Sequence, residues 1–167
     1  VFYMIQPGHL LIDRVDPRDV GGSIKAILSN GELTSITALA IIAGLVLILY
    51  GVASIQTHIE QAGNGGALAK LGYHLILVGI VGWVLSSALV AVIAGGVGLL
   101  AGAVYVIHLG ILQASGVVAG LGFLSFSLAA STRDDFNQIA ALIACVASGI
   151  FVASSVVGIN YPSLLEF

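Results

Sequence analysis

The longest uncharged run in the sequence sets the strongest limit on what this chain can fold into. Residues 95–131 hold no Asp, Glu, Lys or Arg over 37 positions, and residues 71–94 before them hold none either. A helix needs about 20 apolar residues to cross a bilayer. A soluble core helix has no use for an uncharged run of this length, so the run indicates a membrane protein.

Composition agrees with that conclusion. Hydrophobic residues make up 59% of the 167 residues and charged residues only 8%, whereas a soluble domain carries about 25% charged residues. The mean hydropathy is +1.13. Membrane spans take up about 100 residues, so we expect no separate soluble domain. The net charge of −3 comes without a basic cluster, which argues against nucleic acid as a partner.

The apolar segments predict an all-α, polytopic membrane protein, with a bundle of about four transmembrane helices after a short amphipathic helix. We divide the chain into an N-terminal segment 1–31, a transmembrane bundle 32–158 and a C-terminal tail 159–167. The spans are expected at about 33–57, 67–93, 97–131 and 136–158. The third is longer than a bilayer needs. We expect one long helix there, whereas a break within residues 116–122 would give five spans.

The amphipathic helix is expected over residues 17–29 of the N-terminal segment. Asp16 can cap its N-terminus, and Pro17 suits the first helical position. One face of this helix carries the apolar residues Val20, Ile24, Ile27 and Leu28. We expect this face to rest on the membrane interface or to dock on a partner subunit.

The charged residues between the spans predict one helix start and the orientation of the chain. Asp135 and Gln138 have the spacing of a capping box, which predicts a helix from about residue 136. Basic residues favour the cytoplasmic side of a membrane. The side of both termini would carry Arg14, Arg18 and Lys25, and the other side Lys70 and Arg133. This balance of three to two predicts cytoplasmic termini.

Small residues recur along the spans at spacings that let helices approach closely. They comprise Gly72, Gly79, Gly82 and Ser86 in the second span, Gly98-x-x-x-Gly102 in the third, and Ala140, Ala144 and Ser148 in the fourth. These faces exceed what one antiparallel bundle needs. We therefore expect some of them to contact other subunits, and a homo-oligomer is one form that such contacts can take.

The acidic residues argue against ion-coupled transport and against catalysis. All eight lie outside the expected membrane cores, whereas pumps and ion-coupled transporters ordinarily carry an intramembrane acid or base. No carboxylate shares the depth of a buried histidine, so a Ser-His-Asp set cannot form. The sequence also has no phosphate loop and no paired-cysteine metal motif. We expect no catalytic residues and no metal site.

His108 is the sharpest candidate for a cofactor-binding residue. It lies about 16 Å into the third span, near the middle of a bilayer core of about 30 Å. Tyr105 and Ser115 share its helix face. The imidazole could bind the iron of haem b or the magnesium of a chlorophyll. The alternative is a histidine that is hydrogen-bonded to a neighbouring helix.

His74, in the second span, is the second candidate for a cofactor ligand. It lies about 27 Å from the turn between the second and third spans, so the two histidines differ in depth by roughly 10 Å. One haem iron would need both at nearly the same depth, and a bis-histidine haem within this chain is therefore not expected. Cys145 is expected to be a small core residue, and Trp83 a packing or lipid-facing residue.

Together these observations favour a non-catalytic accessory or scaffold subunit of a multi-subunit integral membrane complex. Respiratory or photosynthetic electron transfer is the expected setting, with other membrane subunits and lipids as partners. One alternative is a haem- or chlorophyll-binding membrane subunit with His108 as the ligand. Others are a small homo-oligomeric channel or transporter, and a viral or envelope membrane protein.

Overall fold

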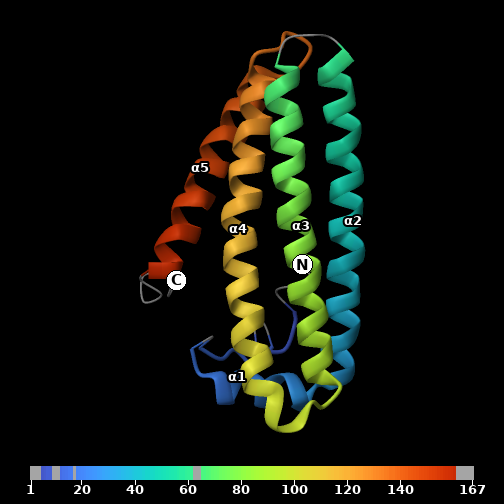
Figure 1. Cartoon of the computed structure of the whole chain (residues 1–167), viewed down its shortest axis with the longest axis vertical. Coiled ribbons are helices and arrows are strands. Elements are labelled where there is room, and N and C mark those ends of the chain that lie inside the picture. Colours follow the sequence, from blue (N-terminus) through green and yellow to red (C-terminus); the bar gives the residue numbers. More distant parts are fainter. Residues whose placement is uncertain (1–4, 9–11, 17, 62–64, 161–167) are drawn as a thin grey trace. The chain divides into compact units, whose positions relative to one another are not determined.

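The computed structural model describes residues 5–8, 12–16, 18–61 and 65–160 (Figure 1). Helices account for 85% of the described residues, and no strand occurs among them. The elements are α1 (Val20–Ser29), α2 (Gly31–Gln61), α3 (Gly66–Ala94), the short 3₁₀ helix η1 (Gly98–Leu100), α4 (Ala101–Ser131) and α5 (Gln138–Asn160). Four of these described helices are long and apolar enough to cross a membrane. This confirms the predicted all-α class and is consistent with a multi-pass integral membrane protein.

The long third span is one helix, as expected, and the alternative of a break within residues 116–122 is wrong. Helix α4 runs without interruption from Ala101 to Ser131. The glycines of that stretch have a different use, because α5 packs there. A Cβ atom added at Gly120 would lie 2.7 Å from Val152 Cγ2 and 2.9 Å from Phe151 Cδ1. Glycine therefore serves close helix approach at this point.

Contacts divide the chain into two compact units. Unit 1 comprises Val1–Val46 and Gly82–Leu112, and unit 2 comprises Leu47–Val81 and Gln113–Phe167. Helices α2, α3 and α4 each contribute one part to each unit, while α1 belongs to unit 1 and α5 to unit 2.

Helix α1 begins three residues later than predicted, and its cap is Asp19 rather than Asp16. The Asp19 carboxylate accepts a hydrogen bond of 2.9 Å from the backbone N–H of Gly22, the bond that an N-cap makes. Asp16 Oδ1 instead accepts from the backbone N–H of Arg18 at 2.9 Å, because the chain turns once more before the helix starts. Pro17 lies outside the described residues.

The apolar face of α1 packs against the end of unit 1 where α3 joins α4 (Figure 1). Ile27 is 4% exposed and belongs to a cluster with Val90, Ile93, Ala101 and Tyr105. Val20 and Ile24 also pack against that cluster. The three residues share one face, as predicted, but the chain's own helices cover it, whereas the membrane interface or a partner subunit was expected there. Leu28 differs, since 47% of it stays exposed. The covered face of α1 is thus narrower than the predicted one.

The turn between α3 and α4 is tight. Gly95 N–H donates to Ala91 O at 3.0 Å, and Gly96 N–H donates to Ile93 O at 2.9 Å. Gly96 has a φ of +86°, a conformation that glycine adopts without steric cost. The helix pair therefore reverses direction with almost no polar loop.

In unit 2, small residues bring α3 and α4 together. A Cβ at Gly79 would lie 2.5 Å from Ala119 Cβ, and a Cβ at Gly122 would lie 2.7 Å from Ile76 N. Gly72 faces the backbone of Phe126 in the same way. Two of the glycines predicted to permit close approach on the second span, Gly72 and Gly79, therefore do so within the chain itself.

Other small residues have no partner of this kind among the described residues. A Cβ at Gly98 or Gly102 would meet nothing within 4 Å, so their motif does not pack helices here. On α5, Ala140 and Ala144 are exposed. The buried small residue of that helix is Ala141, 7% exposed, which packs with Ile59, Ala69 and Ala129.

Candidate functional site

His108 is buried in unit 1, where α4 faces α3, and its hydrogen bonds across to α3 all involve one residue, Ser86. The residue is 5% exposed. Its Nδ1 atom lies 2.7 Å from Ser86 Oγ and 3.0 Å from the backbone carbonyl oxygen of Ser86. Ser86 Oγ is also 3.3 Å from the carbonyl oxygen of His108. The histidine is thus hydrogen-bonded to a neighbouring helix, one of the two roles that the sequence suggested.

These contacts decide which ring nitrogen carries the proton in the neutral imidazole. A carbonyl oxygen only accepts hydrogen bonds, so Nδ1 must donate to Ser86 O. The hydroxyl of Ser86 is then free to donate to the carbonyl oxygen of His108. Nε2 is left with a lone pair and is an acceptor. Nε2 has no hydrogen-bond partner among the described residues.

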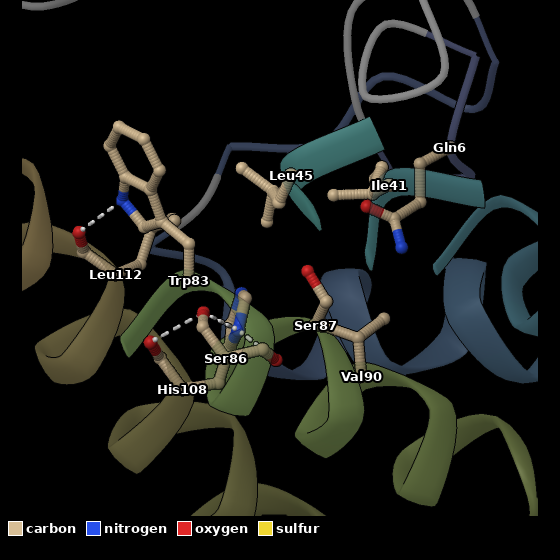
Figure 2. A pocket seen from close by; sticks show the side chains of 9 residues that line it. All are labelled: Gln6, Ile41, Leu45, Trp83, Ser86, Ser87, Val90, His108 and Leu112. Atoms are coloured by element: carbon tan, nitrogen blue, oxygen red, sulfur yellow. Dashed lines mark hydrogen bonds between the residues drawn. The ribbon is translucent and has the colours of Figure 1, made fainter. Parts of the chain in front are cut away.

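Nε2 lies beside a cavity that is bounded by helices α2, α3 and α4 and by the N-terminal segment (Figure 2). The cavity has a volume of about 160 Å³ and is partly open rather than closed. Its lining comprises Gln6, Ile41, Leu45, Trp83, Ser86, Ser87, Val90, His108 and Leu112. The described lining contains no Asp, Glu, Lys or Arg side chain. The cavity is an apolar space with a few polar groups on its wall.

Two further polar side chains line this cavity. Gln6 is 3% exposed, and its Nε2 atom is buried with no hydrogen-bond partner among the described residues. The hydroxyl of Ser87 likewise has no hydrogen bond within the described part of the chain. Figure 2 shows both side chains directed into the space between the helices. Three separate elements therefore bring polar groups to one apolar cavity: Gln6, Ser87 and His108.

Trp83 forms one wall of the cavity and is held by a hydrogen bond. Its indole Nε1–H donates to the backbone carbonyl oxygen of Leu112 at 3.3 Å, which fixes the ring against α4. Tyr105, one turn earlier on α4, packs beside His108 with ring centroids 5.7 Å apart. The position of the imidazole is therefore set by packing as well as by Ser86.

The fit of a haem or a chlorophyll can be tested on these residues. The tautomer of His108 suits a ligand role, since a ligating histidine donates its other N–H to an oxygen acceptor. The space does not suit it. Pockets for drug-sized ligands hold roughly 300–1,000 Å³, and a porphyrin is at least drug-sized, whereas this cavity has about 160 Å³. His108 therefore has the chemistry of an axial ligand but not the room for a macrocycle within unit 1.

His74 belongs to unit 2 and has different surroundings. It is exposed, and its Nδ1 lies 2.7 Å from the carbonyl oxygen of Lys70, one turn earlier in the same helix. Its ring meets the edge of Tyr73 at a centroid distance of 5.6 Å. The described residues contain no group of three or more His, Cys, Asp or Glu side chains that could hold a metal ion. The contacts of His74 are those of a surface histidine on a helix.

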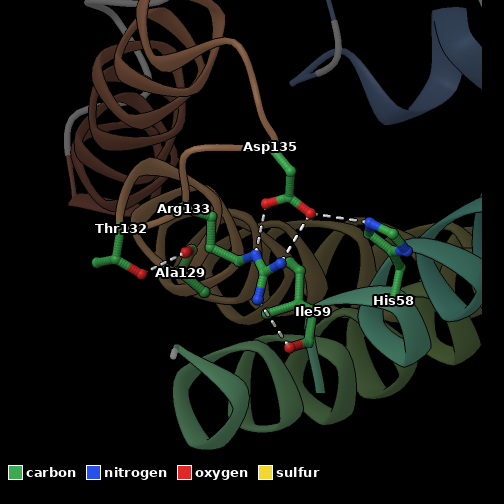
Figure 3. A network of polar contacts seen from close by, with 6 residues as sticks. All are labelled: His58, Ile59, Ala129, Thr132, Arg133 and Asp135. Atoms are coloured by element: carbon green, nitrogen blue, oxygen red, sulfur yellow. Dashed lines mark hydrogen bonds and ion pairs between the residues drawn. The ribbon is translucent and has the colours of Figure 1, made fainter. Parts of the chain in front are cut away.

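A second polar cluster ties the end of α2 to the segment between α4 and α5 (Figure 3). Arg133 Nε and Nη2 each donate to the Asp135 carboxylate at 2.7 Å. His58 Nε2 lies 2.9 Å from Asp135 Oδ2, and Arg133 Nη1 donates to Ile59 O at 3.5 Å. The paired bonds from Arg133, followed by the contact with His58, hold the pKa of the Asp135 carboxyl well below its usual range. The cluster is a network of hydrogen bonds and ion pairs, called the clasp below, that links the end of α2 to the segment before α5.

The predicted capping box of α5 is wrong, because Asp135 takes part in this cluster instead. The Asp135 carboxylate is occupied by Arg133 and His58, and it is not the cap. Asn137 takes that place, since its Oδ1 accepts from Ala140 N–H at 3.1 Å. Helix α5 accordingly begins at Gln138, two residues later than expected.

Sequence reasoning identified His108 but missed the rest of its surroundings. Gln6 stands in a short segment without periodicity, so nothing in the sequence placed it beside a transmembrane helix. Ser87 resembles any other serine of an apolar span. The available signal was the spacing of Trp83 and Ser87 on α3, which puts both on one face of the helix four residues apart.

A scan against protein-family models and searches of curated proteins and of solved structures found no match to this chain.

Proposed function

We propose that this chain is a non-catalytic accessory subunit of a multi-subunit membrane complex, which packs its helices against those of other subunits. The observation that carries the proposal is a set of outward-facing glycines. A Cβ atom added at any of them would meet nothing within 4 Å: Gly44, Gly51, Gly102, Gly110 and Gly149.

The argument rests on how the chain uses glycine elsewhere. Where α3 packs on α4, and α4 on α5, Gly79, Gly120 and Gly122 allow close approach. A glycine inside a helix is less favourable than alanine by about 1 kcal/mol. Outward-facing glycines have no such compensation within the chain. A helix of another subunit would provide it, because small residues are what transmembrane helices use for contact.

Helix α5 presents the largest surface of this kind. Only 11% of its most apolar 18-residue window is buried by the rest of the chain. Ala140, Ala144 and Gly149 share this helix with exposed Ile143 and Val146. The mixture of small and large side chains offers grooves as well as ridges to a neighbouring helix.

We propose cytoplasmic termini for this subunit. Arg14, Arg18 and Lys25 precede the first span, whereas the opposite side carries Lys70 and Arg133. Four spans return the chain to its starting side, and the positive-inside rule favours the side with three basic residues.

The test is purification of a tagged chain from native membranes in a mild detergent, with subunits identified by mass and an absorption spectrum of the intact assembly. We expect several different subunits at fixed stoichiometry, with a respiratory or photosynthetic complex as the expected identity. Recovery of a monomer or of a homo-oligomer alone would overturn the proposal.

Variants show whether the small residues carry the contact. Gly149→Leu and Gly102→Leu should reduce recovery of the other subunits at least several-fold, because a large side chain keeps helices apart. Val146→Leu is the matched control, since it changes a large apolar residue that is 64% exposed by one methylene. Equal recovery from all three variants would contradict a role for the glycines.

A further inference from the structure

We propose that the cavity beside His108 is a binding site for a hydroxylated aromatic ring, such as a free phenol or the head group of a quinol. The inference concerns unit 1 alone and holds whether or not the chain has partner subunits. It starts from three lining residues that each keep a polar atom without a partner among the described residues, Gln6, Ser87 and His108, and from the apolar walls between them.

The unpaired amide of Gln6 is the first observation. Gln6 is only 3% exposed. Its Nε2 atom is fully covered by the chain and has no hydrogen-bond partner among the described residues. Buried polar groups in proteins are nearly always hydrogen-bonded, and leaving one unpaired is costly. Gln6 lines the cavity, and a turn of its terminal amide would bring the donor onto an acceptor atom bound there.

His108 supplies the complementary group. Its Nδ1 proton is held by the carbonyl oxygen of Ser86 at 3.0 Å, which leaves Nε2 as an acceptor on the cavity side. A ligand must therefore donate to Nε2 and accept from Gln6. A carboxylate cannot donate, and an ammonium cannot accept, whereas a hydroxyl group does both. The hydroxyl of Ser87 can bond to the same group or to a second one on the ligand.

The apolar walls identify what carries the hydroxyl. Ile41, Leu45, Trp83, Val90 and Leu112 form most of the lining, and no charged side chain balances an ion there. The volume of about 160 Å³ is close to that of an engineered apolar cavity of about 150 Å³ that binds benzene. One aromatic ring fits this space, and Trp83 offers it an aromatic neighbour.

Water is the competing occupant. At about 30 Å³ for each molecule, the cavity would hold roughly five waters, and each needs two to four polar partners. Among the described lining residues, three side chains offer unpaired polar atoms: Gln6, Ser87 and His108. Waters against the walls of Leu45 and Leu112 would lack partners, so a ring with a hydroxyl matches the lining better than a water cluster does.

The chain carries its own reporter for the test. Trp83 is its single tryptophan, and it lines the cavity, so its fluorescence reports on this site without labelling. Purified full-length protein in detergent is titrated with p-cresol and, separately, with toluene. The two probes have nearly the same shape and differ by the hydroxyl group. We expect a saturable change with p-cresol and binding of toluene weaker by roughly tenfold, the worth of about one hydrogen bond.

Two variants test the polar groups. Gln6→Leu and Ser87→Ala should each weaken p-cresol binding by roughly 3- to 10-fold and leave toluene binding unchanged. Gln138→Leu, at an exposed position, and Ser125→Ala, at a half-buried one, are the matched controls in unit 2. If Gln6→Leu does not fold, Ser87→Ala and the comparison of p-cresol with toluene still test the proposal. Equal affinity for p-cresol and toluene, or no saturable change with either, would overturn the proposal.

A second pair of probes separates a free phenol from a lipid-borne ring. The protein in nanodiscs is titrated with 1,4-hydroquinone and with 2-decyl-1,4-hydroquinone. The affinity of the decyl compound is corrected for its partition into the bilayer. If it then still exceeds the affinity of 1,4-hydroquinone, the site is assigned to a quinol of the membrane. Equal affinity after that correction assigns it to a free phenol. Absence of binding by both compounds would count against the site as a whole.

Discussion

The Nδ1 atom of His108 lies 3.0 Å from the backbone carbonyl oxygen of Ser86 and 2.7 Å from its hydroxyl oxygen. One residue of α3 thus helps to position the imidazole and favours the tautomer that carries its proton on Nδ1, since a carbonyl oxygen can only accept that proton. The same contact turns Nε2 toward the cavity (Figure 2). A packing interaction between two transmembrane helices therefore prepares a hydrogen-bond acceptor inside an apolar space.

Replacement of Ser86 tests how much this contact stabilises unit 1. Ser86→Ala removes the hydroxyl but keeps the backbone carbonyl, so His108 retains one of its two acceptors. We expect the free energy of unfolding to fall by about 0.5–1.5 kcal/mol, the range for a polar contact between transmembrane helices. Unfolding in mixed micelles, followed by circular dichroism, measures the change.

Ser125→Ala is the control for this prediction. The Ser125 hydroxyl donates to Leu121 O of its own helix at 2.9 Å, and the residue is half-buried. Its replacement should change the free energy of unfolding by less than about 0.5 kcal/mol. A Ser86→Ala variant no less stable than Ser125→Ala would show that the Ser86 hydroxyl contributes nothing measurable to the stability of the chain.

His108→Gln tests the haem and chlorophyll alternative. The cavity of about 160 Å³ is too small for a macrocycle, and glutamine keeps a polar group of similar size at this position. We expect the absorption spectrum of the purified native assembly to be the same for the wild type and the variant, normalised to protein. Loss of a Soret or chlorophyll band in His108→Gln, with the subunit composition unchanged, would make His108 a ligand after all.

The sequence predicted the architecture well because long apolar helices follow from composition. Details that depend on one hydrogen bond were less predictable. Asp16 and Asp135 both had suitable spacing for capping, but Asp19 and Asn137 cap the helices instead. In the second case Arg133, two residues away, competes for the carboxylate, and such competition is invisible to a spacing rule.

The candidate site was predictable only in part, for a similar reason. A histidine deep in an apolar span is conspicuous, so His108 stood out. The partners of a cavity come from separate elements, and here they include Gln6 from the N-terminal segment and Ser87 from α3. Their juxtaposition is a property of tertiary packing, which no periodicity of the sequence encodes.

The Asp135 cluster predicts a dependence of stability on pH. The pKa of Asp135 is lowered in the folded protein, first by Arg133 and then by His58. Its contribution is therefore present above the ordinary carboxyl pKa of about 3.9 and is lost as the pH falls toward the folded-state value. The wild type should melt at a higher temperature than Asp135→Asn at pH 5–7, and the two melting temperatures should converge below about pH 4.

Asp134→Asn provides the comparison for that experiment. Asp134 is exposed, and its side chain makes no hydrogen bond to the described residues. Its variant should follow the wild type across the whole pH range. If Asp135→Asn did the same, the clasp between Arg133, Asp135 and His58 would be of no consequence for stability in solution.

Glycine replacements separate the helix contacts inside the chain from the surface offered to partners. At Gly79 a new Cβ would lie 2.5 Å from Ala119 Cβ, so Gly79→Ala must push α3 and α4 apart within unit 2. We expect a loss of about 1–3 kcal/mol in the free energy of unfolding. At Gly51 a Cβ would meet nothing within 4 Å, and Gly51→Ala should be neutral or stabilise the isolated chain by up to about 1 kcal/mol. Thermal unfolding of the two purified variants measures both effects. Two equal losses would mean that Gly51 is packed inside the chain, and it would then no longer support a contact with another subunit.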